Sequence, residues 1–198
     1  YVRRDGRIKY FRQKKNIGGV ANFNFVLEKS RGDYFMWAAA DDRYEKTFVE
    51  KCLRKFKENA EHIMVSSNLE CFDESGAALK NYDLRPVLPL DKDLYKRLKS
   101  HVLAYRSDSK GAPIYGLWDK RKIGSDRLRD YPGWHPSDTG FDVSFIFRNL
   151  SRGTFGLVDE ALFFKNIGFR KEFMARKGVF GIFHRIFHSL VYRLRRIF

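Results

Sequence analysis

The chain has 198 residues, and 39 Lys and Arg against 24 Asp and Glu give it a formal net charge of +15. Hydrophobic residues make up 43% and aromatic residues 16%, which excludes a disordered basic tail and indicates one ordinary folded domain. The charge favours anionic partners, namely nucleic acid, phosphorylated small molecules or an anionic membrane. Two cysteines are too few for a disulfide framework, and no segment is apolar enough to span a bilayer.

Strands and helices alternate over the first 70 residues, which predicts an α/β fold. In chain order we expect a strand at 8–11, a helix after Gly18-Gly19, a strand buried on both faces at 34–40, a helix at 47–59, a strand at 63–66 and a turn at 72–77.

The second half of the chain is less regular. A helix at 91–105 is expected to place Leu94, Leu98 and Val102 inward. After it we expect a short apolar run at 114–118, a loop at 128–138, a helix at 141–150, paired strands at 155–158 and 161–164, and a helix from 178 to the end.

Two adjacent carboxylates, Asp41 and Asp42, follow the most apolar predicted strand. Open α/β sheets bind their ligands at the carboxyl ends of strands, so we expect the pair to face an open cleft. Mg²⁺ or Mn²⁺ is commonly held by one or two carboxylates together with substrate phosphates. The alternative is that these residues form a turn or cap the helix that follows.

The pattern around this pair resembles family 2 glycosyltransferases of the GT-A fold. The resemblance rests on Arg7-Ile8-Lys9-Tyr10-Phe11, Asn16-x-Gly18, Asn22-x-Asn24 and Arg31-Gly32-Asp33-Tyr34, followed by a strand into Asp41-Asp42. It implies a Rossmann-like, mostly parallel sheet flanked by helices. It also implies donor-binding roles for Asn16, Gly18, Asn22, Asp41 and Asp42, the last two also holding Mg²⁺ or Mn²⁺. One departure is Ala39, where many members have a further acid.

The resemblance continues through Gly140-Phe141-Asp142, which by position makes Asp142 the candidate general base of an inverting transfer. Asp138 is the second candidate, and the alternative is that either residue caps the helix. Trp118, Trp134 and His135 are weaker candidates for an acceptor site, because such a Trp is more often a core residue and such a His is more often a surface residue. The His often found after the last strand in related enzymes is replaced here by Asn166-Ile167-Gly168.

We expect a partial GT-A domain over 1–174, since the strands that read the base and ribose in this family would precede Tyr1. The chain alone should then be a poor enzyme. Residues 175–198 carry basic and aromatic residues at helical spacing, without an acid. This predicts an amphipathic helix lying on an anionic membrane, or alternatively packed on the domain.

The sequence therefore predicts a metal-assisted glycosyltransferase of cell-surface polysaccharide synthesis. It would move a sugar from a nucleotide-sugar donor to a glycan or lipid-linked acceptor, at the cytoplasmic face of the cell membrane. One alternative is a catalytically inactive relative that binds or scaffolds. The other is a basic nucleic-acid-binding module, which the concentration of charge at the chain ends disfavours.

Overall fold

The computed structural model describes residues 2–104, 109–129 and 140–167. Its helices are α1 (Gly19–Lys29), α2 (Phe48–Glu58), α3 (Leu94–Leu103), α4 (Lys120–Ile123) and α5 (Phe141–Asn149), with a 3-10 turn η1 (Ala112–Tyr115). Its strands are β1 (Tyr34–Phe35), β2 (Arg43–Tyr44), β3 (His62–Phe72), β4 (Ala78–Tyr82), β5 (Leu117–Asp119) and β6 (Thr154–Asn166). The predicted C-terminal helix lies outside the described residues. Within them, no helix has the length and apolar character needed to cross a membrane.

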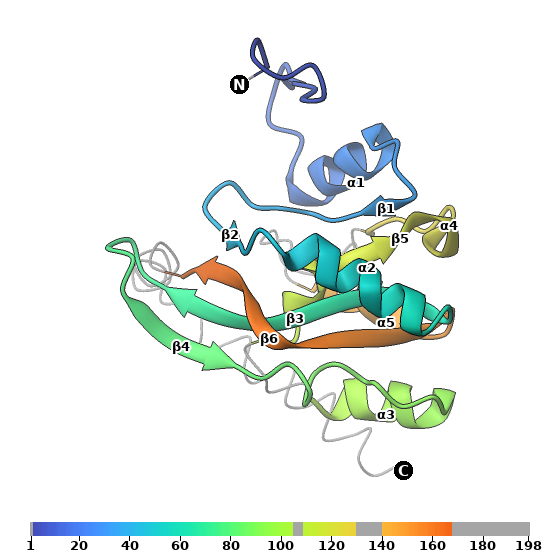
Figure 1. The fold of residues 1–198 in the computed structure, drawn as a ribbon. Coiled ribbons are helices and arrows are strands. Elements are labelled where there is room, and N and C mark those ends of the chain that lie inside the picture. Colours follow the sequence, from blue (N-terminus) through green and yellow to red (C-terminus); the bar gives the residue numbers. More distant parts are fainter. Residues whose placement is uncertain (1, 105–108, 130–139, 168–198) are drawn as a thin grey trace, which may run out of the picture.

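The strands form one curled sheet in the order β1-β5-β3-β6-β2, with β4 also paired to β3 (Figure 1). The long central pair, β3 with β6, is parallel, whereas the other four pairings are antiparallel. The sheet is therefore mixed, and the expectation of a mostly parallel sheet is wrong for the described strands. The short strands β2, β4 and β5 account for the difference, because each runs antiparallel to the long strand with which it pairs.

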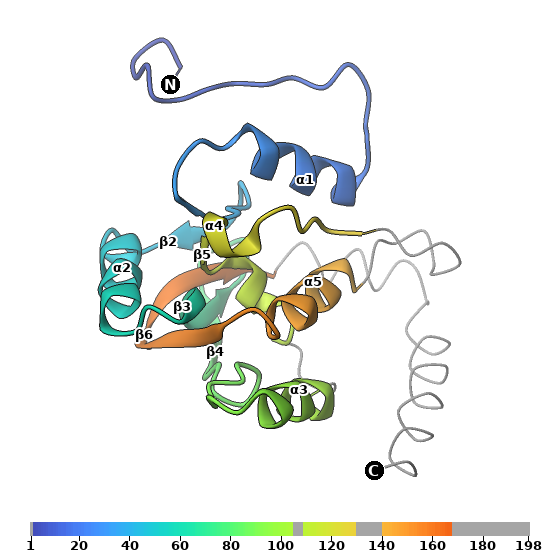
Figure 2. The same ribbon diagram turned by 90° about the vertical axis from the view of Figure 1, so that its right-hand side faces the viewer.

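Helices cover both faces of the central strands, with α2 on one side and α5 on the other (Figure 2). Phe48, Cys52 and Phe56 of α2 are buried, and Leu53 is partly buried against the same core. On the opposite face, the Phe145 ring of α5 packs edge-on against Trp118, with 5.1 Å between ring centroids. The helical spacing read from the sequence thus located both covering helices.

Strand β6 is one continuous element and not the predicted pair of short strands. Asp159 and Glu160, which lie between the two predicted strands, are both exposed. The strand nevertheless stays paired with β3 on either side of them, and register shifts around Asn68 absorb the irregularity. The Asn68 amide also donates a hydrogen bond to Asp159, 3.0 Å away, across the two strands.

Two further predicted strands are reduced or absent. Residues 8–11 form no strand in the described structure, and the side chains of Ile8, Tyr10 and Phe11 are 40%, 71% and 50% exposed. Of the apolar run at 34–40, only Tyr34 and Phe35 pair, with β5. An apolar run becomes a strand only where a partner strand satisfies its backbone, and that partner is missing here among the described residues.

Helix α3 turns inward a face that agrees only in part with the prediction, since of the three predicted residues Leu98 packs against the core and the other two are exposed. Leu94 and Val102 are 44% and 37% exposed, whereas Arg97 and His101 are 6% and 1% exposed. The Arg97 guanidinium is satisfied by backbone carbonyls, including that of Leu150 at 3.1 Å from Nη2. A hydrophobic pattern does not detect such a face, because polar residues form it.

His101 makes the stability of the fold pH-dependent. Its ring nitrogens make no hydrogen bond of normal geometry, although the backbone of Val87 and Val143 lies close enough to act on its pKa. Burial, with a smaller contribution from the charge of Lys110, lowers the pKa of His101 from 6.5 to about 4. The native state therefore keeps the ring neutral in a range where the unfolded chain protonates it.

We expect the free energy of unfolding to fall as the pH falls from 6.5 towards 4, with His101 accounting for about 3 kcal/mol of the loss. Below about pH 4 the native state also takes up the proton, so this contribution stops changing. Urea unfolding across this range should show a flatter pH profile for His101→Met than for the wild type. Parallel profiles for the two proteins would contradict the assignment.

Candidate functional site

Asp41 and Asp42 lie in the turn that joins the extended segment after β1 to β2. The Asp42 amide donates a hydrogen bond to the Ala39 carbonyl, 3.4 Å away, which closes the turn. The N-cap of α2 is Thr47, so neither aspartate caps that helix. Asp41 is exposed, whereas the Asp42 side chain is only 2% exposed. The two carboxylates therefore differ, and Asp42 does not face open solvent as we expected of the pair.

The end of β6 surrounds the Asp42 carboxylate. Its Oδ1 accepts a hydrogen bond from the Asn166 backbone N–H at 3.0 Å. Its Oδ2 has no hydrogen-bond partner and lies 3.6 Å from Nζ of Lys165. Burial raises the pKa of Asp42, while the charge of Lys165 and the Asn166 hydrogen bond act in the opposite direction. The carboxylate is thus buried, and the ion pair with Lys165 compensates only part of the cost of burying Oδ2.

Aromatic rings line this site. The Lys165 Nζ lies 4.2 Å from the centroid of the Tyr115 ring, a cation–π contact. Tyr44 stacks on Phe163 with 4.8 Å between centroids, and its hydroxyl donates to the Trp37 carbonyl at 3.2 Å. Burial and then the nearby charge of Asp42 raise the pKa of the Tyr44 hydroxyl, which therefore stays protonated.

The donor atoms at this turn fit a hard divalent cation. Asp42 Oδ2 is a buried carboxylate oxygen without a hydrogen bond, and Asp41 supplies a neighbouring exposed carboxylate. Mg²⁺ is commonly held by one or two carboxylates, with water and substrate phosphates completing the shell. No group of three or more His, Cys, Asp or Glu residues suited to a metal occurs in the described part of the chain. Among the described residues, the ligands of such a cation would be Asp41 and Asp42.

Asp142 lies in the first turn of α5, where its Oδ1 accepts a hydrogen bond from the Val143 N–H at 2.7 Å. The N-cap residue is Gly140, so Asp142 favours the helix start without being its cap. A Cβ added to Gly111 would lie 2.1 Å from Asp142 Oδ2. The carboxylate is therefore seated directly against the backbone that leads into η1.

The turn η1 runs between the environment of Asp142 and the environment of Asp42. Gly111 at its start touches Asp142, and Tyr115 at its end lies beneath Lys165, the partner of Asp42. Four residues of 3-10 helix rise on the order of 8 Å. The structure thus brings the predicted metal ligand and the predicted base to opposite ends of one short turn.

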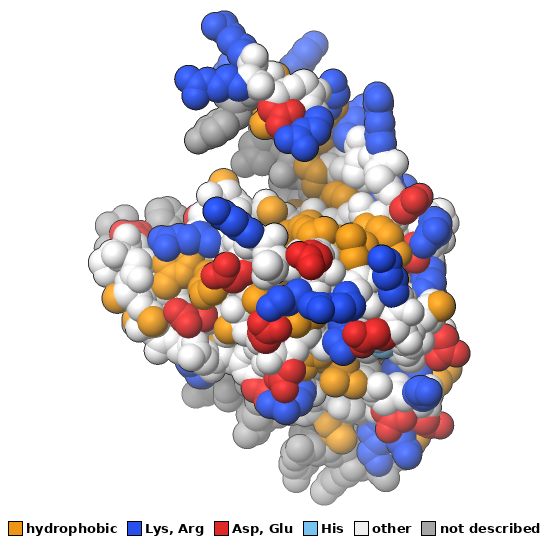
Figure 3. Space-filling view, viewed as in Figure 1, with side chains coloured by type: hydrophobic (Ala, Val, Ile, Leu, Met, Phe, Trp, Pro, Cys, Tyr) orange, Lys and Arg blue, Asp and Glu red, His pale blue; other side chains and the backbone are white. Residues whose placement is uncertain are grey.

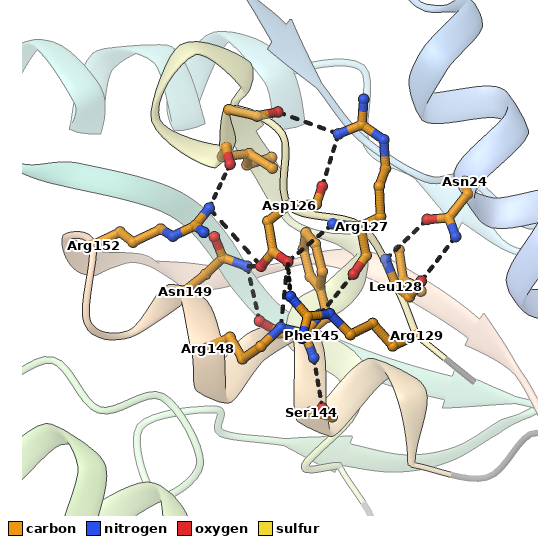
Figure 4. A network of polar contacts seen from close by, with 12 residues as sticks. Asn24, Asp126, Arg127, Leu128, Arg129, Ser144, Phe145, Arg148, Asn149 and Arg152 are labelled. Carbon is orange, nitrogen blue, oxygen red and sulfur yellow. Dashed lines mark hydrogen bonds and ion pairs between the residues drawn. The ribbon is translucent and has the colours of Figure 1, made fainter. Parts of the chain in front are cut away.

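A buried ionic network fixes α5, and with it Asp142 (Figure 4). The Asp126 carboxylate, whose side chain is 1% exposed, accepts hydrogen bonds from Arg148 Nε at 3.3 Å and Asn149 Nδ2 at 3.0 Å. Arg152 and Arg129 each lie 3.9 Å from it. Because both oxygens are occupied, the network holds α5 rigidly against the segment after α4.

The predicted donor-binding residues near α1 lie on its exposed start. Asn16 Oδ1 accepts a hydrogen bond from the Gly18 N–H at 2.8 Å, which makes the predicted Asn-x-Gly turn. Asn16, Gly18 and Asn22 are all exposed. Asn24 instead makes two 2.9 Å hydrogen bonds to the Leu128 backbone, so it joins α1 to the segment that carries Asp126. No described contact links Asn16, Gly18 or Asn22 to Asp41 or Asp42.

The acceptor candidate Trp118 is a core residue. Its side chain is 0% exposed, and its indole N–H donates to the Ile114 carbonyl at 2.9 Å. No sugar can stack on it, so that prediction is wrong. Trp134, His135 and Asp138 lie outside the described residues. Lys165 was not predicted as the partner of Asp42, although a lysine directly after the apolar pair Phe163-Phe164 was a usable signal.

Comparison with known proteins decides the family. Residues 1–112 match Glycosyl transferase family 2. The chain belongs to this family. An uncharacterized glycosyltransferase of Rickettsia felis (strain ATCC VR-1525 / URRWXCal2) is 29% identical over 87 residues, which are 43% of this chain and 14% of that protein. The aligned part thus spans a small fraction of the relative's length. Enzymes of family 2 typically use a divalent cation, which agrees with the donor atoms at Asp41 and Asp42.

The contact between Gly111 and Asp142 can be tested without a substrate. Gly111 has φ −82°, which alanine adopts freely, so only the carboxylate opposes a side chain there. We expect Gly111→Ala to lower the free energy of unfolding by about 1–3 kcal/mol, measured by urea denaturation. In an Asp142→Ala background the same change should be neutral or slightly stabilising.

Gly6→Ala is the matched control, since nothing lies within 4 Å of a Cβ at that exposed position. An equal loss from Gly111→Ala in both backgrounds would show that Asp142 is not the group against Gly111.

Proposed function

We propose that this protein transfers a sugar from a nucleotide-sugar donor to a glycan or lipid-linked acceptor, with inversion, in cell-surface polysaccharide synthesis. The observation that carries the proposal is the carboxylate pair of a family 2 chain, in which Asp42 keeps a buried oxygen without a hydrogen bond beside the exposed Asp41. Such a pair is best suited to bind a hard cation, which in turn binds the diphosphate of the donor.

Asp41 and Asp42 would hold Mg²⁺ or Mn²⁺ in this proposal. A bound cation neutralises charge that develops on the leaving diphosphate. The protein contributes the orientation, since the Asn166 N–H fixes Asp42 Oδ1 and leaves Oδ2 for the ligand. The exposed turn at Asn16 and Gly18, with Asn22 on the next helical turn, is proposed to contact the donor.

Asp142 is proposed as the general base, with Asp138 as the second candidate. A base must accept the proton of the acceptor hydroxyl while that oxygen attacks the anomeric carbon. The seat against Gly111 and the Val143 hydrogen bond restrict the Asp142 carboxylate to one orientation, as such a role requires. In a transfer assay, loss of activity in Asp138→Asn but not Asp142→Asn would move the role to Asp138.

Two other functions are alternatives for this chain. A catalytically inactive relative would keep the fold and bind without turnover, and Ala39 in place of a further acid is the feature that favours it. A nucleic-acid-binding module draws support from the net charge of +15, but the basic residues of the N-terminal segment gather at one end of the molecule (Figure 3, top), which disfavours it. Membership of a transferase family argues against the latter.

Donor binding gives the direct test of the proposal. In calorimetric titrations with UDP and with GDP, we expect binding that requires Mn²⁺ and weakens at least about tenfold in Asp41→Asn and Asp42→Asn. Glu45→Gln, which removes a carboxylate from an exposed neighbouring position, should bind like the wild type. Unchanged binding by both aspartate variants would refute the site.

We further propose that the basic segment at 175–198 holds the protein at an anionic membrane surface. Six basic residues without an acid supply about 1 kcal/mol each near such a surface. In vesicle sedimentation, binding to phosphatidylglycerol vesicles should decrease as salt is added and should disappear when 175–198 is deleted. Equal sedimentation of the deleted and intact chains would place the contact elsewhere or show that there is none.

A further inference from the structure

The other buried carboxylates in the described part of the chain are fully hydrogen-bonded. Both oxygens of Asp119 accept from the Arg121 guanidinium, at 3.0 and 2.9 Å, and both oxygens of Asp126 accept hydrogen bonds as well. Among the described residues, Asp42 Oδ2 is the one buried carboxylate oxygen without such a partner. A buried carboxylate oxygen left in this state is costly, which suggests that a ligand completes it.

Lys165 compensates Asp42 only partly. Its Nζ is 3.6 Å from Oδ2, an ion-pair distance rather than a hydrogen bond, and its side chain is 17% exposed. The same ammonium lies 4.2 Å from the Tyr115 ring centroid and 5.7 Å from that of Phe163. The lysine is thus shared between a carboxylate and two aromatic faces, and it stands next to the oxygen that a cation would use.

We propose that Lys165 controls the access of a divalent cation to Asp42, because the ammonium and the cation compete for the same oxygen, Oδ2. This inference rests on the proposed function, since it takes Asp42 as a cation ligand. Two positive charges cannot both lie against one carboxylate oxygen without strong repulsion. Lys165 therefore neutralises the charge of Asp42 until a divalent cation displaces the lysine ammonium, and in this way it determines which cations gain access to the carboxylate.

The competition sets the cation affinity, which can be measured without substrate. We expect Lys165→Met to bind Mn²⁺ alone about tenfold more tightly than the wild type, as detected by electron paramagnetic resonance of free Mn²⁺. Lys165→Arg keeps the charge and should leave the affinity unchanged. The gain should vanish in Lys165→Met with Asp42→Asn, because the contested oxygen is then gone.

Lys51→Met is the matched control for the change in net charge, since Lys51 pairs with Glu160 and not with Asp42. Mn²⁺ binding by Lys165→Met that is no tighter than that of the wild type, including no binding by either, would overturn the proposal. A gain of equal size in Lys51→Met would do the same, because the effect would then come from net charge.

A second measurement needs no variant that could fail to fold. In the wild-type chain, titration with Mg²⁺ should shift the nuclear magnetic resonance signal of the Lys165 side chain as its ion pair opens. A signal that stays unchanged while Mg²⁺ shifts the Asp42 carboxylate signal would refute the competition. That result would leave the proposed function intact, whereas an absence of Mn²⁺-dependent UDP and GDP binding by the wild type would count against the function and not against the competition.

Discussion

The parallel pairing of β3 with β6 is the interaction on which the rest of the structure depends. It is the longest pairing in the sheet, and on β3 it buries Ile63, Met64 and Val65 completely. It also fixes where β6 ends. Strand β2 pairs antiparallel with that end, Arg43 opposite Phe164, so the residue before β2 and the residue after Phe164 must meet. Those residues are Asp42 and Lys165.

The register of the β2–β6 pairing therefore places Asp42 beside Lys165. A shift of one residue in the β2–β6 pairing would point the Asp42 side chain to the other face of the sheet and separate it from Lys165. The stacked Tyr44 and Phe163 rings oppose such a shift, because they form a directly paired position of that ladder. Packing energy in the core thus holds a charged pair in a place that costs free energy to maintain.

The sequence predicted those elements whose partners are local. Helical spacing located α1, α2 and α5, and the apolar run after Arg31-Gly32-Asp33 located the turn at Asp41-Asp42. It failed where a distant partner decides. The thirteen residues of β6 stay one strand because β3 pairs along them. Helix α3 buries Arg97 because backbone carbonyls, including that of Leu150, accept hydrogen bonds from its guanidinium. The role of Lys165 depends on sheet register, which the residues of one strand do not specify.

The 3-10 turn η1 fixes the spacing between Asp42 and Asp142, because both ends of the turn pack against buried elements. At its far end, a Cβ on Gly116 would lie 2.6 Å from the Met64 sulfur and 2.9 Å from the Val65 carbonyl, so the turn lies directly on β3. At its near end, Gly111 lies directly against Asp142. Neither end can move without displacing a buried strand or α5. The acid proposed to bind a cation and the acid proposed to accept a proton are therefore held apart by close packing.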